Sequence, residues 1–158
     1  MIKSYFDQAD DETGDIAKMA KNHPNVHRTI KEIVEYNGFN FENHTVTTED
    51  GYVLEMHRLY ANLSQPLPEN ATRPVLMMQH GLVATSETFV MSGNESQAFY
   101  FAREGYDVWL GNNRESLYGR KHIDLDPDDP EDAEEFFDFS FYEMGKYDAP
   151  AQVDYIRN

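Results

Sequence analysis

The stretch Val75-Leu76-Met77-Met78-Gln79-His80-Gly81-Leu82 places four consecutive apolar residues directly before a turn that contains glycine. A short apolar run of this kind, ended by His80-Gly81, predicts a β-strand that is buried on both faces. Residues 98–105 then predict a helix, and Tyr106-Asp107-Val108-Trp109-Leu110 predicts a second buried strand. Two strands joined through a helix are typical of a parallel pair with a right-handed crossover. This part of the chain therefore predicts an α/β sheet.

A helix and a hairpin are expected before this unit. Apolar residues recur with helical spacing after Pro24, at Val26, Ile30, Ile33 and Val34. The capping-box pattern Thr29-x-x-Glu32 predicts the start of the helix and Gly38 predicts its end. From His44 the apolar period changes to two, and the turn Glu49-Asp50-Gly51 separates two β-prone runs. This pattern predicts a β-hairpin that extends the sheet.

A final helical segment is expected after the second buried strand. The pattern Ser140-x-x-Glu143 predicts a capped first turn that runs to Tyr147. Asp148 is then expected to cap a second segment, in which Pro150 is tolerated because it lies in the first turn. That segment should direct three side chains inward, those of Ala151, Tyr155 and Ile156. The acidic residues 1–23 carry no clear period and predict a loosely ordered lead-in, so that residues 24–158 form the domain.

Composition excludes several classes of protein. The 158 residues carry a net charge of -16 and contain no cysteine. So negative a surface repels phosphate backbones, which argues against general nucleic-acid binding. The lack of cysteine excludes disulfide scaffolds, thiolate zinc sites and cysteine nucleophiles. Eleven of the sixteen net negative charges lie after residue 79, and the segment 124–135 alone supplies eight acidic residues.

Targeting signals in the sequence point in two directions. No apolar run reaches the roughly 20 residues of a membrane-spanning helix, and the first residues lack the apolar stretch of a signal peptide. Four sequons for N-glycosylation nevertheless hint at a secretory history, and they begin at Asn43, Asn62, Asn70 and Asn94. Coincidence is the alternative explanation, and the sequence leaves the localisation open.

Self-contained catalytic motifs are missing. The chain has no Gly-x-Gly-x-x-Gly, P-loop or His-Glu-x-x-His pattern, and none of its seven serines lies in a Gly-x-Ser-x-Gly elbow. The one candidate for transition-state stabilisation is the turn Gly81-Leu82, because a main-chain N–H at a strand end can bind a developing oxyanion. A side chain at Gly81 would block the approach of a substrate oxygen. The backbone N–H of Leu82 would be the donor, with an ordinary strand-ending turn as the alternative.

Five blocks in order give residues 24–158 a resemblance to the amino-terminal part of the acid lipase family, which includes lysosomal and gastric lipases. The blocks are Thr48-Glu49-Asp50-Gly51-Tyr52-Val53-Leu54 with Arg58, Gln79-His80-Gly81-Leu82, residues 104–112 with Arg114, Arg120-Lys121-His122, and Phe139-Ser140 with Glu143-Met144 and residues 146–151. The resemblance implies a partial α/β-hydrolase fold with an amino-terminal hairpin, parallel strands and crossover helices. It also implies hydrolysis of neutral lipid esters, such as triacylglycerols or sterol esters.

Carried over residue by residue, the resemblance leaves this chain one catalytic element, the Leu82 N–H as half of an oxyanion hole. The nucleophile strand with its serine, the acid and the histidine would lie beyond Asn158, so whether this chain alone is an enzyme stays open. Glu115 stands where the family usually has Gly and adds charge near the side expected to bind acyl chains. Phe137 stands where Trp is common. No cofactor is implied.

Other polar residues have structural interpretations. The alternating acids from Asp124 onward resemble a calcium loop only faintly, since no glycine takes the sharp-turn position, and a solvated loop without metal is expected. His80, His122 and Arg114 are expected to hold loops in place, and Trp109 to fill the core. The buried Asp107 should find a main-chain or cationic partner.

Two hypotheses for function follow. In the first, the chain is the amino-terminal fragment of a lipase and is inactive alone, and the strand Val75–Gln79 would expose an apolar edge to a complementing carboxy-terminal segment. In the second, the chain is a non-enzymatic half-sheet module that uses the same edge for self-association or assembly.

Overall fold

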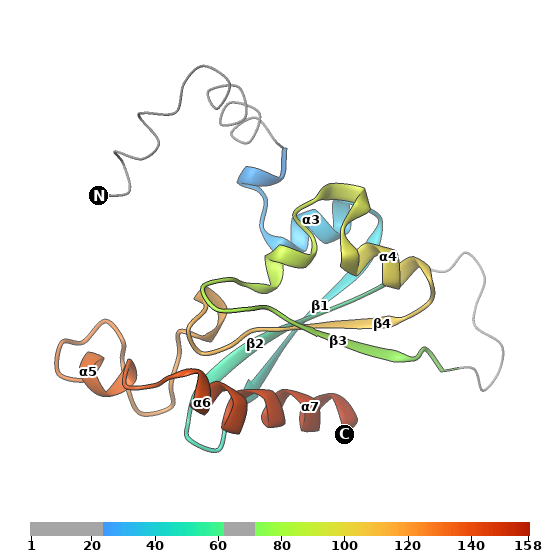
Figure 1. Ribbon diagram of the computed structural model, residues 1–158. Coiled ribbons are helices and arrows are strands. Elements are labelled where there is room, and N and C mark those ends of the chain that lie inside the picture. The colour runs from blue at the N-terminus through green and yellow to red at the C-terminus, as the bar shows by residue number, and fades with distance from the viewer. Residues whose placement is uncertain (1–23, 62–71) are drawn as a thin grey trace.

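The computed structural model describes residues 24–61 and 72–158, and within them one four-stranded sheet carries helices on both faces (Figure 1). The strand order is β1-β2-β4-β3. The strands are β1 (Phe39–Thr47), β2 (Val53–Ala61), β3 (Val75–Gln79) and β4 (Asp107–Gly111). The helices are α3 (Ile30–Tyr36), α4 (Gln97–Arg103), α5 (Ala133–Phe136), α6 (Phe141–Glu143), a π-helical turn (Met144–Asp148) and α7 (Ala149–Arg157). Short 3-10 turns span Pro24–His27, Ser86–Phe89, Gly93–Glu95 and Leu117–Gly119. The lead-in predicted for residues 1–23 lies outside the described residues.

The amino-terminal helix and the hairpin are confirmed. Thr29 and Glu32 form the predicted capping box of α3, and Gly38 follows the helix with φ +84°. Strand β1 begins at Phe39, five residues earlier than the period of two indicated, because Gly38 turns the chain directly from helix into strand. Phe39 then stacks on Phe99 of α4 with ring centroids 4.8 Å apart, which holds this early part of β1 on the core.

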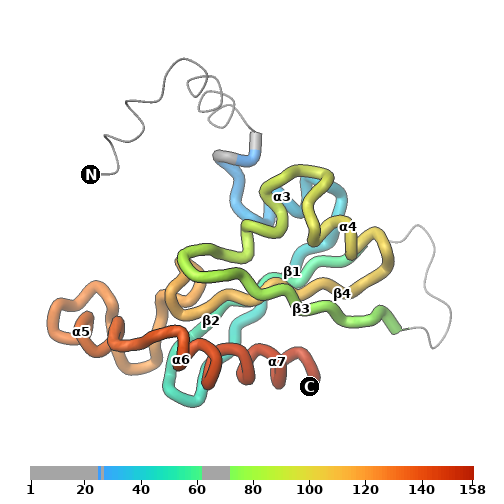
Figure 2. Tube along the Cα trace, viewed as in Figure 1, coloured from blue at the N-terminus to red at the C-terminus, as the bar shows by residue number. Residues whose placement is uncertain are grey.

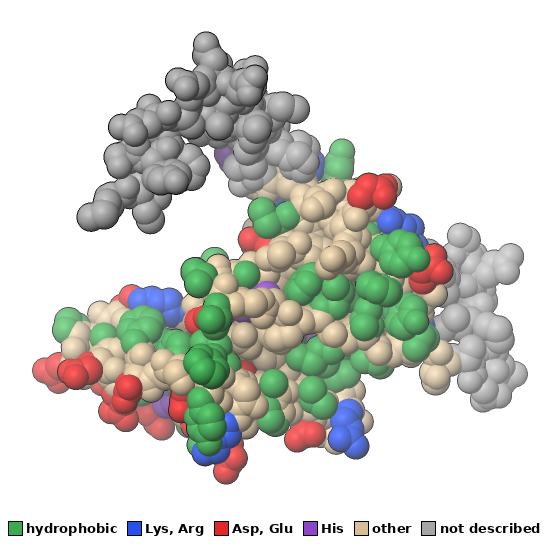
Figure 3. Space-filling view, in the orientation of Figure 1, with side chains coloured by type: hydrophobic (Ala, Val, Ile, Leu, Met, Phe, Trp, Pro, Cys, Tyr) green, Lys and Arg blue, Asp and Glu red, His purple; other side chains and the backbone are tan. Residues whose placement is uncertain are grey.

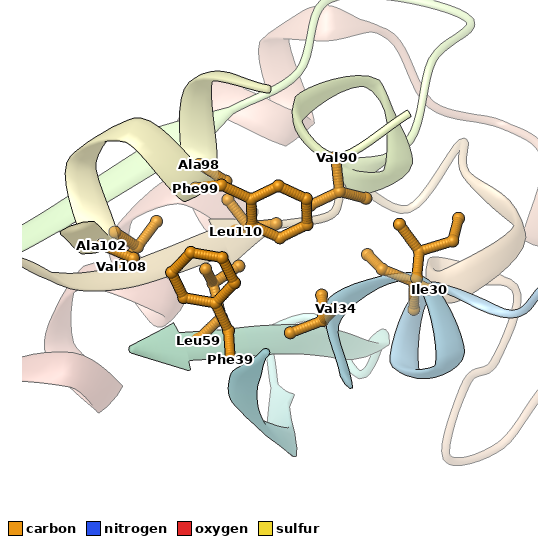
Figure 4. Packing of buried hydrophobic residues seen from close by; sticks show 11 residues of the cluster. Ile30, Val34, Phe39, Leu59, Val90, Ala98, Phe99, Ala102, Val108 and Leu110 are labelled. Atoms are coloured by element: carbon orange, nitrogen blue, oxygen red, sulfur yellow. The ribbon is translucent and has the colours of Figure 1, made fainter. Parts of the chain in front are cut away.

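The crossover unit is also confirmed, and it forms the main core. Strands β3 and β4 pair in parallel from Val75↔Asp107 to Gln79↔Gly111, and α4 connects them over one face of the sheet (Figures 1 and 2). Helix α3 lies on the same face. Side chains from α3, α4, β2 and β4 interdigitate beneath these helices (Figure 4), with Val34, Leu59, Phe99, Val108 and Leu110 among the buried members.

The prediction for β3 is wrong in one respect. Strand β4 is buried along its whole length, as expected, but β3 is not buried on both faces. Its residues are half-buried or exposed, and Val75 is 52% exposed. The reason is topological: β4 lies between β2 and β3, so among the described residues β3 pairs on one side only and forms the edge of the sheet. The apolar run therefore lies along an edge that the described chain leaves uncovered.

The second face of the sheet is covered by α6, the π-helical turn and α7, which run on from one another (Figure 1). The capping box of Ser140 and Glu143 is confirmed. The expected cap by Asp148 is wrong, since Asp148 has helical backbone angles and its side chain makes no capping bond. The helical backbone continues through Asp148, so no helix N-terminus with unpaired N–H groups lies there. The Asp148 carboxylate binds Arg114 instead.

The inward face of α7 also differs from the expectation. Gln152 is the fully buried side chain of this helix, while Ala151 and Ile156 are half-buried and Tyr155 is 38% exposed. Tyr155 still touches the sheet edge-on at Trp109. The period of apolar residues does not predict a buried glutamine at position 152. In the interior the Gln152 side-chain nitrogen donates to the main-chain carbonyl of Asn112, while its side-chain oxygen is buried without a partner among the described residues.

The acidic segment 124–135 forms a surface loop that leads into the short helix α5. Figure 3 shows acidic side chains gathered over this end of the molecule. Phe136 anchors the loop, since it is completely buried against Tyr52 and Leu54, and its carbonyl accepts a hydrogen bond from the Tyr52 hydroxyl. A small second core thus ties the loop to the hairpin.

Candidate functional site

The turn that follows β3 holds the predicted donor. Leu82 is 62% exposed, and its N–H has no hydrogen-bond partner among the described residues. The next residue, Val83, is 98% exposed and has φ +59°, which is unfavourable for a β-branched side chain. A Cβ at Gly81 would meet nothing within 4 Å, so the described residues themselves do not demand glycine there. Any steric need for Gly81 would come from outside the described residues, from a substrate or from another segment.

His80 fixes the base of this turn. The imidazole Nε2 accepts a hydrogen bond from the N–H of Asn113 at 3.2 Å, so Nδ1 must carry the proton that it donates to the carbonyl of Gly81 at 2.8 Å. Gln79 adds a bond from its amide nitrogen to the Asn113 side chain at 2.8 Å. With both ring nitrogens engaged and only 5% of its surface exposed, His80 is a structural residue, as predicted.

Asn112, at the end of β4, joins three parts of the chain. Its side-chain oxygen accepts from the N–H of Ser86 and its amide nitrogen donates to the carbonyl of Glu55, both at 2.9 Å. Its own carbonyl accepts from Gln152 of α7 at 3.1 Å. These bonds hold the loops that leave β3 and β4 against β2 and α7. The turn with Leu82 is therefore carried on a rigid support.

A buried serine–histidine pair lies nearby, and the sequence patterns gave no sign of it. His57 Nδ1 and Ser86 Oγ are 2.8 Å apart, and the imidazole packs edge-on against Tyr118. Burial lowers the pKa of His57 to about 4, with Glu55 opposing the shift. Ser86 is completely buried and His57 is 1% exposed, so no substrate can reach the hydroxyl. The pair is a packed polar contact, and the missing Gly-x-Ser-x-Gly elbow agrees with that.

Arg114 is the centre of a buried ionic cluster. Its guanidinium contacts Asp50 in the hairpin turn and Asp148 before α7, each at 2.7 Å, and it covers the ring of Tyr52 at 3.9 Å. Burial disfavours the charged guanidinium, but the two carboxylates raise the pKa of Arg114 further above its ordinary value. The expected role of Arg114 as a loop anchor is confirmed.

The two carboxylates of this cluster respond in opposite ways. Burial raises the pKa of Asp148, although Arg114 works against that effect. Asp50 is more exposed, so the hydrogen bonds from Arg114 and Thr48 outweigh burial and lower its pKa. The cluster locks the hairpin to the last helix.

Asp107 has the cationic partner that burial requires. Arg58 of β2 binds both carboxylate oxygens, at 2.7 and 2.8 Å, and also contacts Glu42 of β1 at 2.9 Å. The guanidinium lies 5.2 Å from the ring of Trp109, which is 6% exposed and contacts His44 and Tyr155. Trp109 is thus a core residue, as expected.

The loop after the 3-10 turn Leu117–Gly119 is held by hydrogen bonds between side chains and the main chain. His122 contacts the carbonyl of Asp50 at 2.9 Å through Nε2, and its Nδ1 accepts from two backbone N–H groups of the acidic segment. Acidic side chains within the segment 124–135 also accept hydrogen bonds from its backbone. The Asp126 carboxylate accepts from the N–H of Asp128, and the Asp129 carboxylate accepts from the N–H of Glu131. In the part of the chain that the structure describes, no three His, Asp or Glu side chains are grouped to hold a metal ion.

Phe137 and Glu115, the two residues that depart from the family pattern, differ in burial. Phe137 is 50% exposed beside Arg120, whose guanidinium lies 5.8 Å from its ring. Glu115 is half-buried, and one of its carboxylate oxygens is buried without a hydrogen-bond partner among the described residues.

Chemically, the described residues provide an unpaired main-chain donor, the Leu82 N–H, on a turn that hydrogen bonds hold in place. Ser86 is the one described serine whose hydroxyl contacts a histidine, and it is enclosed. No described helix is long and apolar enough to cross a bilayer. Exposed apolar side chains lie on the donor turn, at Leu82 and Val83, and on the loops after β3 and β4, at Met91 and Leu117. This combination fits part of a hydrolytic site better than a complete one.

Comparison with known proteins agrees with this geometry. Residues 30–93 match a family described as a partial alpha/beta-hydrolase lipase region. The chain is 40% identical to human lipase member K over 84% of its own length and 32% of that protein. It is 42% identical to Drosophila melanogaster lipase 1, covering 81% of the chain and 26% of the relative. It is 39% identical to human gastric triacylglycerol lipase, covering 90% and 35%.

The chain therefore spans about a quarter to a third of the length of the curated relatives it matches. The mixed sheet with helices on both faces has the architecture that a partial α/β-hydrolase fold requires. The resemblance inferred from the sequence blocks is thus confirmed: the chain corresponds to the amino-terminal part of the gastric and related acid lipases.

Proposed function

We propose that this chain is the amino-terminal portion of a lipase that hydrolyses ester bonds of neutral lipids, triacylglycerols or sterol esters, and that it is inactive by itself. The observation that carries the proposal is that Leu82, a residue 62% exposed, has an N–H without a partner among the described residues, on a turn held by His80 and Asn113. Such a preorganised N–H can stabilise the oxyanion of ester hydrolysis. The name of the gastric triacylglycerol lipase relative supports the substrate class.

We propose that the chain is inactive by itself because no described serine both contacts a histidine and lies open to a substrate. The Ser86 hydroxyl is enclosed with His57, and the Ser140 hydroxyl caps α6. A complementing carboxy-terminal segment would supply the serine, the acid and the histidine.

The topology favours β3 as the place where that segment joins. Helix α4 crosses one face between β3 and β4, and α7 follows β4 on the opposite face. A right-handed crossover from β4 through α7 carries the next parallel strand past the occupied position, to the free side of β3. Val75 and the half-buried methionines of β3 would then be covered.

The test compares the purified chain with the same chain complemented by the carboxy-terminal part of a relative. On a short-chain nitrophenyl ester, the chain alone should not exceed buffer, and complementation should restore turnover. Robust turnover by the lone chain that is lost in Ser86→Ala would refute the proposal.

A matched pair of variants tests the donor itself in the complemented protein. Leu82→Pro removes the N–H and should lower kcat by about 10² to 10³. Leu82→Ala keeps the N–H and should leave kcat within a few-fold. Equal activity of the two variants would exclude the Leu82 N–H from the oxyanion hole.

The exposed β3 edge also supports a second candidate function, that of a half-sheet module for assembly. A stable oligomer of the lone chain by size-exclusion light scattering, together with no gain of activity on complementation, would favour that function over the lipase.

A further inference from the structure

Two of the four sequons lie in described residues, and both acceptor asparagines are exposed. Asn43-His44-Thr45 lies within β1, and Asn94-Glu95-Ser96 lies in the turn before α4. Transfer of an oligosaccharide needs the Asn-x-Ser/Thr pattern, and the folded protein must then leave the modified nitrogen in solvent. Asn62 and Asn70 lie outside the described residues.

The surroundings of Asn43 fit a glycan. Its side-chain nitrogen faces the solvent side of β1 and donates a single hydrogen bond, at 3.1 Å, to Glu55 of β2. A glycosylated amide keeps one N–H, so this bond can persist after modification. Thr45, the third residue of the sequon, is also exposed. Asn94 differs, because its side-chain oxygen binds Arg103 and the hydroxyl-bearing Ser96 is 2% exposed.

We propose that Asn43 is an N-glycosylation site of this protein when the chain is made through the secretory pathway. The donor would be a lipid-diphosphate-linked oligosaccharide. The Asn43 nitrogen forms the bond to the anomeric carbon and loses one proton, and the lipid diphosphate departs as the leaving group.

The position of Asn43 in the sheet gives the glycan a physical effect. Strand β1 is nine residues long, and among the described strands it pairs only with β2. Its outer side therefore presents unpaired N–H and C=O groups that can template pairing with another chain. A bulky, hydrophilic oligosaccharide near the middle of this strand hinders such pairing.

The experiment secretes the full chain from eukaryotic cells behind a cleavable leader and treats it with a peptide amidase that removes N-glycans. Release converts a glycosylated asparagine to aspartate, so peptide mass spectrometry should report Asn43→Asp. Thr45→Ser keeps the sequon and should keep the conversion, whereas Thr45→Ala and Asn43→Gln should abolish it. An unconverted Asn43 in the secreted parent chain overturns the proposal, whether or not another sequon is occupied.

A second measurement tests the effect on the edge. Thr45→Ala and Thr45→Ser differ by little except the sequon, and Thr45 is exposed, so a folding defect is not expected in either. The unglycosylated Thr45→Ala chain should self-associate at a several-fold lower concentration by light scattering. Equal association of the two variants would remove the proposed shielding of β1.

Discussion

Acidification should destabilise this protein through His57. The imidazole is 1% exposed, and burial lowers its pKa to about 4, whereas the unfolded chain carries an ordinary histidine with a pKa of 6.5. As the pH falls from 6.5 towards 4, His57 binds a proton in the unfolded state but stays neutral in the folded state. Stability that is present above pH 6.5 is therefore lost across this window.

The size of the effect follows from that gap. At 1.36 kcal/mol per pH unit, the difference between 6.5 and about 4 corresponds to about 3 kcal/mol when both limits are passed. Between pH 7 and pH 4.5 the expected loss is about 2 kcal/mol. Glu55 is the one nearby charge that opposes the shift, and Ser86 and Tyr118 contact the ring without carrying charge at these pH values.

The assay is denaturant unfolding of the parent chain and His57→Gln at pH 7, 5.5 and 4.5. Trp109 is the only tryptophan in the sequence and lies buried in the sheet, so its fluorescence reports unfolding of the fold itself. Carboxylates also titrate in this range, but they are common to both chains, so the difference between their pH slopes isolates His57. Parallel pH profiles of the two chains would refute the reasoning.

Two further substitutions test the packing. Asp148→Ala leaves the buried Arg114 without one of its partners and should lower the free energy of unfolding by about 3 kcal/mol or more, whereas the exposed Asp154→Ala should change it by less than about 0.5 kcal/mol. Gly119→Ala would place a Cβ 2.3 Å from a main-chain carbonyl oxygen and should cost about 1–3 kcal/mol, whereas Gly145→Ala meets no atom within 4 Å and should be neutral or stabilising. Denaturant unfolding measures both pairs, and a reversed order within either pair would contradict the packing described.

Local signals predicted most of the elements because each depends on neighbouring residues. The capping boxes at Thr29 and Ser140 and the hairpin turn at Gly51 all form as their patterns indicate. The Asp107 pairing was also foreseeable in kind, since a buried carboxylate needs a partner, although its identity as Arg58 was not.

Of the candidate functional site, the sequence predicted only the turn Gly81-Leu82 that follows strand β3. Its support by Asn113 and Asn112, and the enclosure of Ser86 with His57, involve residues tens of positions apart. No periodicity or spacing along the chain encodes such contacts. Asp148 is an example of such a distant contact. Its place before Pro150 predicted a helix cap, but its carboxylate instead accepts hydrogen bonds from Arg114, 34 positions earlier in the chain.

The sequence by itself determined the class of this protein: an α/β unit with a parallel crossover, a large acidic excess, and motif blocks of the acid lipases. The apolar period did not show which strand lies at the centre of the sheet. The tertiary structure places β4 there and β3 at the edge, a position that only the family resemblance had implied for β3. Burial of an apolar run depends on which strands flank it, and strand order is set by the crossover and the packing of α4 and α7. The same apolar residues that read as an interior strand therefore become the open edge of the sheet.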